Sequence, residues 1–189
     1  MTEFAMLKGL DTADTRAVIS AARRRKFKRG EAICREGDPG DTLFLLDRGH
    51  VAVRVTTPLG DTATMRVLGP GSQFGEIAVI ESVPRSATVV ALDAVETLGL
   101  HRDVIQTLRQ SHETVDQVLL SASLHEVVRL TTALAEALYL QVPKRLARTL
   151  QRLLDVFPDG VIPLTQDDIA GLCGTTRQTA NEVLQALVA

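Results

Sequence analysis

Alternating apolar and polar positions, interrupted by turn residues, dominate the first half of the chain. The turn signals recur about every 8–12 residues, a rhythm typical of an antiparallel sandwich or barrel. They fall at residues 37–40, 48–49, 58–61, 69–71 and 83–84. Short strands are predicted between them, at residues 43–46, 51–55, 65–67 and 88–92. Together with a helical spacing over residues 12–22, this pattern predicts a small β-roll that ends near Leu100, within a first domain of residues 1–110.

The pattern changes to a helical period in the second half. Residues 111–140 contain neither proline nor glycine, and apolar positions recur there at spacings of four and three, which is the pattern of a coiled-coil seam. The seam comprises Leu120, Leu124, Val127, Thr131, Leu134 and Leu138. A long helix with so narrow a stripe most simply pairs with a second copy, so we expect a two-fold homodimer. The alternative is that the stripe packs on the chain's own β-roll.

Residues 141–189 are expected to form a further, helical domain. Beyond its first helix, residues 161–164 have the texture of a short strand. Thr165 and Asp168 then form a capping-box-like start, a short apolar-faced helix follows, and Gly174 permits a sharp turn into a second helix. Two short helices joined by such a turn make a helix-turn-helix, although the apolar spacing also fits an ordinary helical hairpin.

Composition indicates the broad class of protein but not its function. With 45% apolar and 23% charged residues in 189, the chain is typical of a soluble globular protein. No run approaches the roughly 18 apolar residues of a membrane span, and the N-terminus has no signal-peptide core, so we expect a cytoplasmic protein. Cys34 and Cys173 are too few for a disulfide framework or a metal site, and no metal is expected. Because the net charge is −2, any nucleic-acid contact must come from a local surface.

Candidate chemistry is concentrated in residues 74–89, which read F-G-E-I-A-V-I-E-S-V-P-R-S-A-T-V. A phosphodiester requires a guanidinium fork with nearby NH and OH donors, and a ribose hydroxyl requires a carboxylate acceptor. Glu76, Arg85 and Ser86 supply these groups within one short segment. The segment resembles the phosphate-binding cassette of cyclic-nucleotide-binding domains, whose pattern is F-G-E-hydrophobic-A-hydrophobic, a spacer, then P-R-(S/T/A)-A.

A second resemblance lies in residues 166–184. Their order, Q-x-x-I-A-x-x-x-G-x-x-R-x-T-x-x-x-x-L, resembles the DNA-reading unit of the catabolite activator (CRP/FNR) regulator family. The two matches occur in that family's order, with the predicted long helix between them. The resemblance implies an α+β fold: an antiparallel β-roll, a dimerisation helix over 111–140, and a winged-helix-type helix-turn-helix over 141–189 that ends at Ala189 without its wing.

The same resemblance implies an allosteric transcription regulator. The implied partners are double-stranded DNA, a second copy of the chain and RNA polymerase, and the implied effector is cAMP. Carried over to this sequence, Glu76 accepts from the ribose 2′-OH, Arg85 pairs with the cyclic phosphate, and Ser86 donates to a phosphate oxygen. The other implied ligand-binding residues act through a closely approaching backbone: Gly75, Ile77, Ala78 and Ala87.

The resemblance implies fewer contacts to the base of the nucleotide than to its phosphate and ribose. Family members hold the adenine amino group with hydroxyls of the dimer helix, and alignment places Leu130 and Thr131 at those positions. Thr131 fits this role, or it sets the register of the seam. Leu130 departs from the usual hydroxyl, although Thr132 nearby offers one. Recognition of cGMP, or DNA binding that is independent of any ligand, therefore stays open beside cAMP.

Base reading in DNA is implied for the second helix of the last unit. Arg177 matches an arginine that reads guanine in the major groove, and Gln178 is suited to adenine. The remaining candidates of this helix and its N-terminus are Thr175, Thr176, Thr179 and Asn181. Glu182 stands where close relatives often carry arginine, so their target sequence cannot be transferred to this chain.

Rival interpretations find less support in the residues. A haem or iron–sulfur sensor would need clustered cysteines or spaced histidines, and the sequence has neither. An enzyme is not expected, because the segment from His125 to Arg129 begins like H-E-x-x-H but lacks the second histidine. A channel or kinase subunit would share the cassette but not the helix-turn-helix. The basic run from Arg23 to Arg29 is interpreted as a solvated face, with phosphate contact as its alternative.

Overall fold

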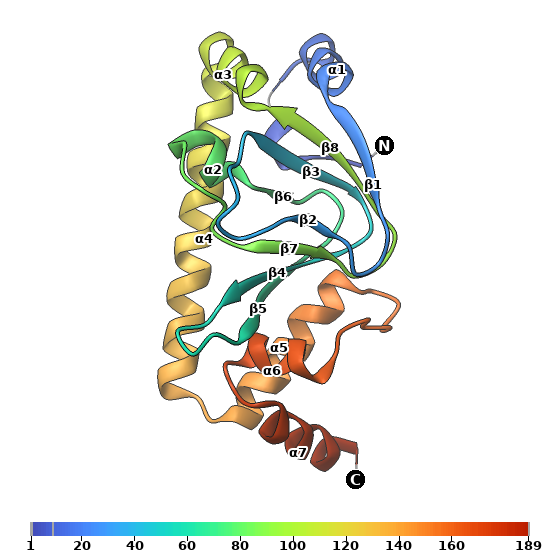
Figure 1. The fold of residues 1–189 in the computed structure, drawn as a ribbon, viewed down its shortest axis with the longest axis vertical. Helices are drawn as coiled ribbons and strands as arrows, with labels where there is room; N and C mark the ends of the chain where they lie inside the picture. Colours follow the sequence, from blue (N-terminus) through green and yellow to red (C-terminus); the bar gives the residue numbers. More distant parts are fainter. Residues whose placement is uncertain (1, 9, 189) are drawn as a thin grey trace.

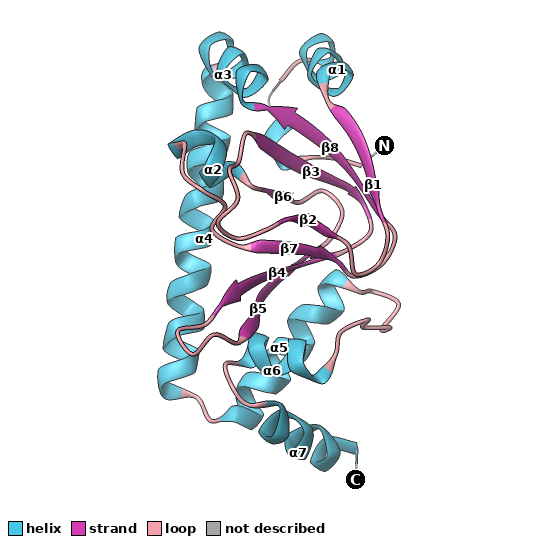
Figure 2. Ribbon diagram, in the orientation of Figure 1, coloured by secondary structure: helices cyan, strands magenta, loops and turns pink. Residues whose placement is uncertain are grey.

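The structure, a computed structural model, describes residues 2–8 and 10–188 (Figures 1 and 2). The N-terminal part contains η1 (Ala5–Leu7), α1 (Thr12–Ala21), β1 (Arg23–Phe27), β2 (Ala32–Cys34), β3 (Thr42–Arg48), β4 (Val51–Thr56), β5 (Thr62–Leu68), β6 (Gln73–Phe74), α2 (Glu76–Glu81), β7 (Thr88–Ala91) and β8 (Val95–His101). The C-terminal part contains α3 (Arg102–Ser111), α4 (Glu113–Tyr139), α5 (Val142–Val156), α6 (Gln166–Cys173) and α7 (Arg177–Val188).

The strands form two antiparallel sheets of four strands, ordered β1-β8-β3-β6 and β2-β7-β4-β5. Side chains of β3 alternate between two apolar clusters. Phe44 and Leu46 point into the core between the sheets, while Leu43 and Leu45 point toward α1, α3 and the start of α4. Because both faces of β3 are covered, its sequence is a continuous apolar run. The predicted β-roll is confirmed, and its last strand ends at His101.

Helix α4 runs along one side of the β-roll, as the yellow ribbon in Figure 1 shows. Only its first turns enter the core, through Val115 and Leu119. The predicted helix is confirmed from residue 113 onward, whereas residues 102–111 form the separate helix α3. The predicted apolar seam faces outward: its Leu and Val side chains are between 56% and 66% exposed. The seam therefore does not pack on the chain's own β-roll.

Helix α4 is more apolar than expected from the sequence, which predicted no stretch of the length and apolarity of a membrane span. Among the described residues, the stretch Thr114–Tyr139 is long and apolar enough to cross a membrane by those criteria alone, whereas the sequence had been expected to hold no such stretch. The same helix carries Glu126, which pairs with Arg66 of β5 and with Arg129 one turn further along α4. It also carries Glu136, which pairs with Arg148 and Arg152 of α5. Beyond the first turns, the face of α4 toward the protein therefore carries these charged groups, while the outward stripe is apolar.

The C-terminal helices form a compact unit, visible in orange and red in Figure 1. The capping box is confirmed: the Thr165 hydroxyl accepts from the backbone of Asp168, and the Asp168 carboxylate accepts from the backbone of Thr165. Gly174 ends α6 in the left-handed conformation, with φ of 62°, and allows the sharp turn. The predicted strand over 161–164 is wrong, because these residues pair with no strand of the described part of the chain. Ile162 and Leu164 pack instead against the cluster between α5 and β4–β5.

Helix α6 also rests on the β-roll. The Asp168 carboxylate, 5% exposed, accepts from the Thr64 hydroxyl at 2.6 Å and from Arg54 Nη2 at 2.8 Å. Gly171 lies so close to β5 that an added Cβ would be 2.7 Å from the Thr64 nitrogen. Strand β5 therefore contacts the helix-turn-helix through Thr64, while Arg66, two residues further along the same strand, lines a cavity of the β-roll.

Candidate nucleotide pocket and DNA-reading surface

A cavity of about 310 Å³ lies between the segment around α2, strands β4 and β5, and helix α4. Its volume is within the range of small-molecule sites. The cavity is lined by both ends of the predicted cassette, from Gly75 to Ala78 and from Arg85 to Ala87. On the opposite side it is lined by Glu126, Arg129 and Leu130 of α4. The fold thus brings one face of the long helix to the cassette.

Local backbone geometry places Arg85 inside the cassette. Gly75 precedes α2 with φ of 84°, a conformation that favours glycine. A Cβ at Gly75 would collide with the Arg85 guanidinium, and one at Gly40 would lie 2.7 Å from Arg85 Nε. Two glycines therefore provide the room that the arginine side chain occupies. This explains why position 75 holds glycine and not a residue with a Cβ atom.

Arg85 is a buried cation without an anionic partner. Its side chain donates to the carbonyl oxygens of Gly75 at 2.9 Å and Thr42 at 2.7 Å, and it lies 5.6 Å from the centre of the Phe44 ring. The residue is 6% exposed, yet no described carboxylate lies within ion-pair distance of it. Because a buried charge is normally paired, this arrangement has the features of an anion-binding site.

Glu76 faces the same cavity from the first turn of α2. Its Oε2 atom is buried and has no hydrogen-bond partner in the structure. Burial raises the pKa of Glu76, and the neighbouring Glu126 acts in the same direction, while Arg66 and Arg85 partly offset both effects. An orphaned, buried acceptor is costly unless a donor reaches it. A ligand hydroxyl entering the cavity would supply that donor.

The other cassette candidates also line the cavity. Ile77 is 49% exposed there, whereas Ala78 is buried beside Gly40. Ser86 is exposed and Ala87 half-buried at the far end of the cassette. The structure therefore brings all seven cassette candidates together around one cavity.

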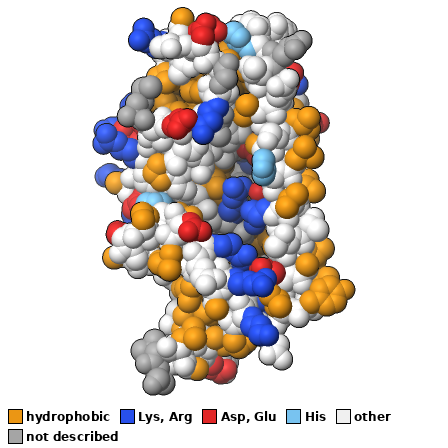
Figure 3. All heavy atoms as spheres, turned by 180° about the vertical axis from the view of Figure 1, so that it is seen from behind, with side chains coloured by type: hydrophobic (Ala, Val, Ile, Leu, Met, Phe, Trp, Pro, Cys, Tyr) orange, Lys and Arg blue, Asp and Glu red, His pale blue; other side chains and the backbone are white. Residues whose placement is uncertain are grey.

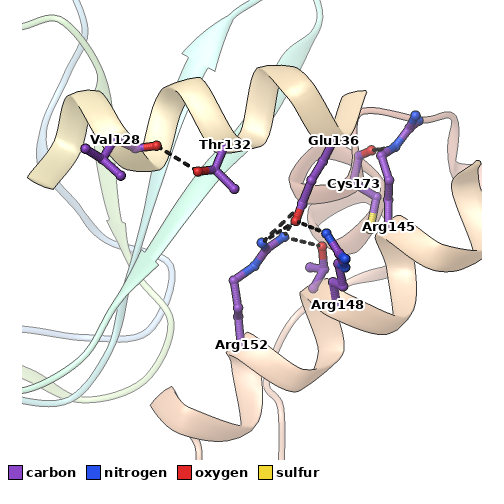
Figure 4. Close-up of polar contacts among 8 residues, drawn as sticks. Val128, Thr132, Glu136, Arg145, Arg148, Arg152 and Cys173 are labelled. Carbon is purple, nitrogen blue, oxygen red and sulfur yellow. Dashed lines mark hydrogen bonds and ion pairs between the residues drawn. The ribbon is translucent and has the colours of Figure 1, made fainter. Parts of the chain in front are cut away.

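The two ligand-binding candidates of α4, Leu130 and Thr131, point to different sides of the helix. Leu130 lines the cavity, but Thr131 does not. The Thr131 hydroxyl donates to the carbonyl of Val127 at 2.9 Å on the exposed seam. Thr132 does not line this cavity either, and its hydroxyl donates to the carbonyl of Val128, as Figure 4 shows. In this chain, α4 therefore presents no hydroxyl to the cassette.

A charged cluster in the cavity was missed by the sequence analysis. Glu126 Oε2 accepts from Arg66 Nη1 at 2.8 Å and from Arg129 Nε at 2.9 Å, and Glu126 Oε1 accepts from Arg129 Nη2 at 2.6 Å. The hydrogen bonds of Arg129 hold the pKa of Glu126 below its usual range, despite burial. The i,i+3 spacing of Glu126 and Arg129 is readable from the sequence, but the approach of Arg66 from β5 is not.

The candidates for reading DNA lie at the start of α7. Arg177 and Gln178 are exposed side by side on its first turn. Arg177 Nη1 is 3.5 Å from Asp167 Oδ2, and Gln178 Nε2 donates to Glu182 at 3.1 Å. Both contacts are weak surface contacts that a stronger partner can replace.

The other DNA-binding candidates, Thr175, Thr176, Thr179 and Asn181, make contacts within the helix-turn-helix. The Thr176 hydroxyl accepts from the backbone of Thr179 and thereby caps the helix, and Thr175 is half-buried in the turn. Asn181 accepts from Gln166 at 2.9 Å and so joins α6 to α7.

The basic run of β1 is exposed, and Arg24 and Lys26 form ion pairs there with acidic residues of β3 and β8.

Arginines also hold the long helix to the C-terminal unit. Glu136 of α4 is 8% exposed and accepts from Arg148 and Arg152 of α5, as Figure 4 shows. Arg145 donates to carbonyls at the ends of α4 and α6. A second cavity of about 650 Å³ adjoins these contacts between α4, α5 and β5. In Figure 3, Lys and Arg side chains form a band beside a column of hydrophobic side chains.

Comparison with known proteins identifies the family. The cyclic nucleotide-binding domain matches residues 24–112, and the Crp-like helix-turn-helix domain matches residues 144–189. The Cyclic AMP receptor protein of Thermus thermophilus is 31% identical over 185 residues, covering 96% of this chain and 84% of that protein. The chain belongs to the CRP family of transcription regulators.

A second relative and a solved structure support this assignment. The CRP-like cAMP-activated global transcriptional regulator of Mycobacterium tuberculosis is 26% identical over 186 residues, covering 95% of this chain and 83% of that protein. The crystal structure of Thermus thermophilus catabolite activator protein has a TM-score of 0.65 at 28% identity and covers 97% of this chain and 86% of that one. The predicted α+β fold and family are confirmed. The CRP family consists of regulators rather than enzymes, in agreement with the sequence analysis.

Proposed function

We propose that this CRP family member is a homodimeric transcription regulator whose effector is cAMP. Residues 1–110 bind the nucleotide, residues 111–140 dimerise, and residues 141–189 bind double-stranded DNA. The regulator acts in the cytoplasm together with RNA polymerase. The names of the Mycobacterium and Thermus relatives support cAMP as the effector.

The observation that carries the proposal is the buried, unpaired guanidinium of Arg85. The cyclic phosphate pairs with it and with the Ser86 hydroxyl, and the ribose 2′-OH donates to Glu76. The cavity is lined by three arginines and two glutamates, so with both glutamates ionised its lining has one positive charge in excess. A cyclic mononucleotide carries one negative charge and balances it. Backbone groups of Gly75, Ile77, Ala78 and Ala87 complete the ligand contacts.

The exposed seam of α4 supports the homodimer. Its apolar side chains form one continuous stripe along the helix, and an exposed apolar patch of this kind typically marks an interaction surface. A second copy buries the stripe in a two-fold, self-complementary interface. Thr131 then lies near the middle of that interface, where it sets the register of the two helices.

DNA binding is assigned to α7. Arg177 reads guanine and Gln178 reads adenine in the major groove, while Thr175, Thr176, Thr179 and Asn181 contact phosphate or position the helix. In a homodimer, two α7 helices read half-sites about one DNA turn apart, roughly 34 Å. Ligand shifts the population of dimers toward this spacing.

Isothermal titration with cAMP and with cGMP tests the effector. Wild type is compared with Arg85→Ala and with the matched control Arg35→Ala, since Arg35 is exposed and outside the cavity. We expect saturable cAMP binding that Arg85→Ala abolishes and Arg35→Ala preserves, because truncation leaves the phosphate charge buried and unpaired. Tight cAMP binding by Arg85→Ala would refute the assigned site. Absence of binding by wild type would instead indicate a regulator that binds DNA without a nucleotide.

A further inference from the structure

On the side of the cavity formed by α4, the charged side chains come from a cluster outside the cassette: Arg66, Glu126 and Arg129. The hydroxyls of Thr131 and Thr132 are bonded to backbone carbonyls of α4 and do not line the cavity, and Leu130 offers no polar atom. The polar side chains that line the cavity from this side are Arg66, Glu126 and Arg129. In the proposed pose, the phosphate is at Arg85, the ribose is at Glu76, and the base extends toward these residues, which line the same cavity and of which Arg66 and Glu126 act on Glu76 through their charges.

The cluster retains hydrogen-bonding capacity for a ligand. A carboxylate has about four lone-pair sites, and three of those on Glu126 are used by Arg66 and Arg129. Arg66 uses only Nη1 toward Glu126, and Arg129 uses Nε and Nη2. The Glu126 side chain remains 35% exposed at the cavity. The cluster thus offers a free acceptor site next to free guanidinium donors.

This pairing of groups discriminates between purines. The outer edge of adenine presents the N6 amino donor next to the N7 acceptor, whereas that of guanine presents two acceptors, O6 and N7. A carboxylate beside a guanidinium complements the donor and acceptor of adenine. Guanine in the same position would set its O6 against the carboxylate of Glu126. Charge-assisted hydrogen bonds of this kind are among the strong ones.

We propose that Glu126, held by Arg66 and Arg129, is the residue that selects adenine in this protein by accepting a hydrogen bond from the N6 amino group. A guanidinium of the same cluster donates to N7. The carboxylate thereby takes the place of the hydroxyl that Leu130 lacks. This inference rests on the proposed function, since it requires a cyclic nucleotide in the cavity.

Titration with three nucleotides tests the proposal: cAMP, cGMP, and the cyclic monophosphate of purine riboside, which lacks the amino group. Wild type is compared with Glu126→Gln and Glu126→Met. The matched control is Asp116→Asn, an exposed carboxylate of α4 that pairs with Arg109 away from the cavity. Thermal unfolding of each variant without ligand reports whether it is folded.

We expect wild type and Asp116→Asn to bind cAMP about 10- to 100-fold more tightly than the amino-free analogue. In Glu126→Gln and Glu126→Met this ratio shrinks to a few-fold, on top of any change in affinity that loss of the carboxylate charge causes for both nucleotides alike. A residue that only holds the arginines in place would alter the affinity for both ligands alike and leave the ratio unchanged.

Three outcomes would overturn the inference. Equal binding of cAMP and the analogue by wild type means that no group reads the amino group, and this result does not depend on any variant. An unchanged ratio in both Glu126 variants excludes Glu126, and a larger loss for cGMP than for cAMP assigns the cluster to guanine. In all three cases cAMP binding that requires Arg85 preserves the proposed function. Failure of wild type to bind any of the nucleotides refutes both.

Discussion

The contact between α6 and β5 leads to a quantitative prediction for Asp168→Asn. The Asp168 carboxylate accepts from the Thr165 backbone and hydroxyl, from Thr64 and from Arg54, at 2.6 to 3.0 Å. An asparagine of the same shape keeps one acceptor oxygen and turns an NH₂ group toward donors. The substitution therefore removes the charge and leaves buried donors unsatisfied, without creating a cavity.

The magnitude follows from the bonds that are lost. The charge-assisted bond to Arg54 contributes about 1.5–3 kcal/mol. Weakening of the capping box adds about 1 kcal/mol. Since Asn retains part of the acceptor capacity, we expect α6 to be destabilised by about 2–4 kcal/mol in total. The loss is local, because the affected bonds join α6 to its own cap and to the β4–β5 hairpin.

Hydrogen exchange of the α6 amides measures this loss directly. The matched control is Asp167→Asn, which removes the same charge from the same helical turn but at a side chain that is 64% exposed. We expect the control to change stability by no more than about 0.5 kcal/mol. Equal exchange rates in the two variants would refute the claim that the buried network holds α6 on the β-roll.

The pH dependence of this difference has a definite sign. Burial alone would raise the pKa of Asp168, but hydrogen bonds from Thr64 and Thr165 and the charge of Arg54 outweigh it and lower the pKa. A lowered folded-state pKa contributes stability above the usual carboxyl pKa of about 3.9, and this is lost as pH falls through the folded value. The difference between wild type and Asp168→Asn should therefore decrease below about pH 4.

Three further predictions concern the pocket, the seam and the reading helix. Glu76→Gln should raise the melting temperature of the ligand-free protein at pH 7. Burial raises the pKa of Glu76, so stability is lost as pH rises through the folded value, and the gain should disappear below pH 4. Leu134→Glu, on the exposed seam, should convert the proposed homodimer to monomers in sedimentation experiments, because it buries a charge at the interface. Arg177→Ala should weaken operator binding by about 1–3 kcal/mol and relax selectivity at one base pair in binding-site selection.

Controls make these three outcomes decisive. For the seam, Leu59→Glu replaces a leucine that is 90% exposed on the β4–β5 turn and should leave the dimer intact. For the reading helix, Arg16→Ala on α1 should not alter base selectivity. A Glu76→Gln protein that melts below wild type at pH 7 would contradict the interpretation of its buried carboxylate as an unsatisfied group. A dimeric Leu134→Glu protein would contradict the seam, and unchanged selectivity in Arg177→Ala would contradict its role.

The sequence by itself determined the order of the domains and the cassette. Alternation with regular turns specified the β-roll, since a two-residue period with glycine corners fits few other folds. The spacing of Gly75, Glu76 and Arg85 was enough to bring them to one cavity, because the required backbone turn and the charged groups lie in one short segment. The capping box at Thr165 and the turn at Gly174 were likewise predictable, as both depend on residues close in sequence.

Other features were decided only by the tertiary structure. The sequence pattern could not tell that residues 161–164 lack a strand partner, because pairing depends on which neighbour is nearby. It also could not bring Arg66 of β5 to Glu126 of α4, or Thr64 to Asp168, because these pairs are 60 and 104 residues apart. Local chemistry therefore specified the cassette side of the cavity. The side formed by Arg66, Glu126 and Arg129, and the contact between β5 and the helix-turn-helix, arise from the packing of distant elements.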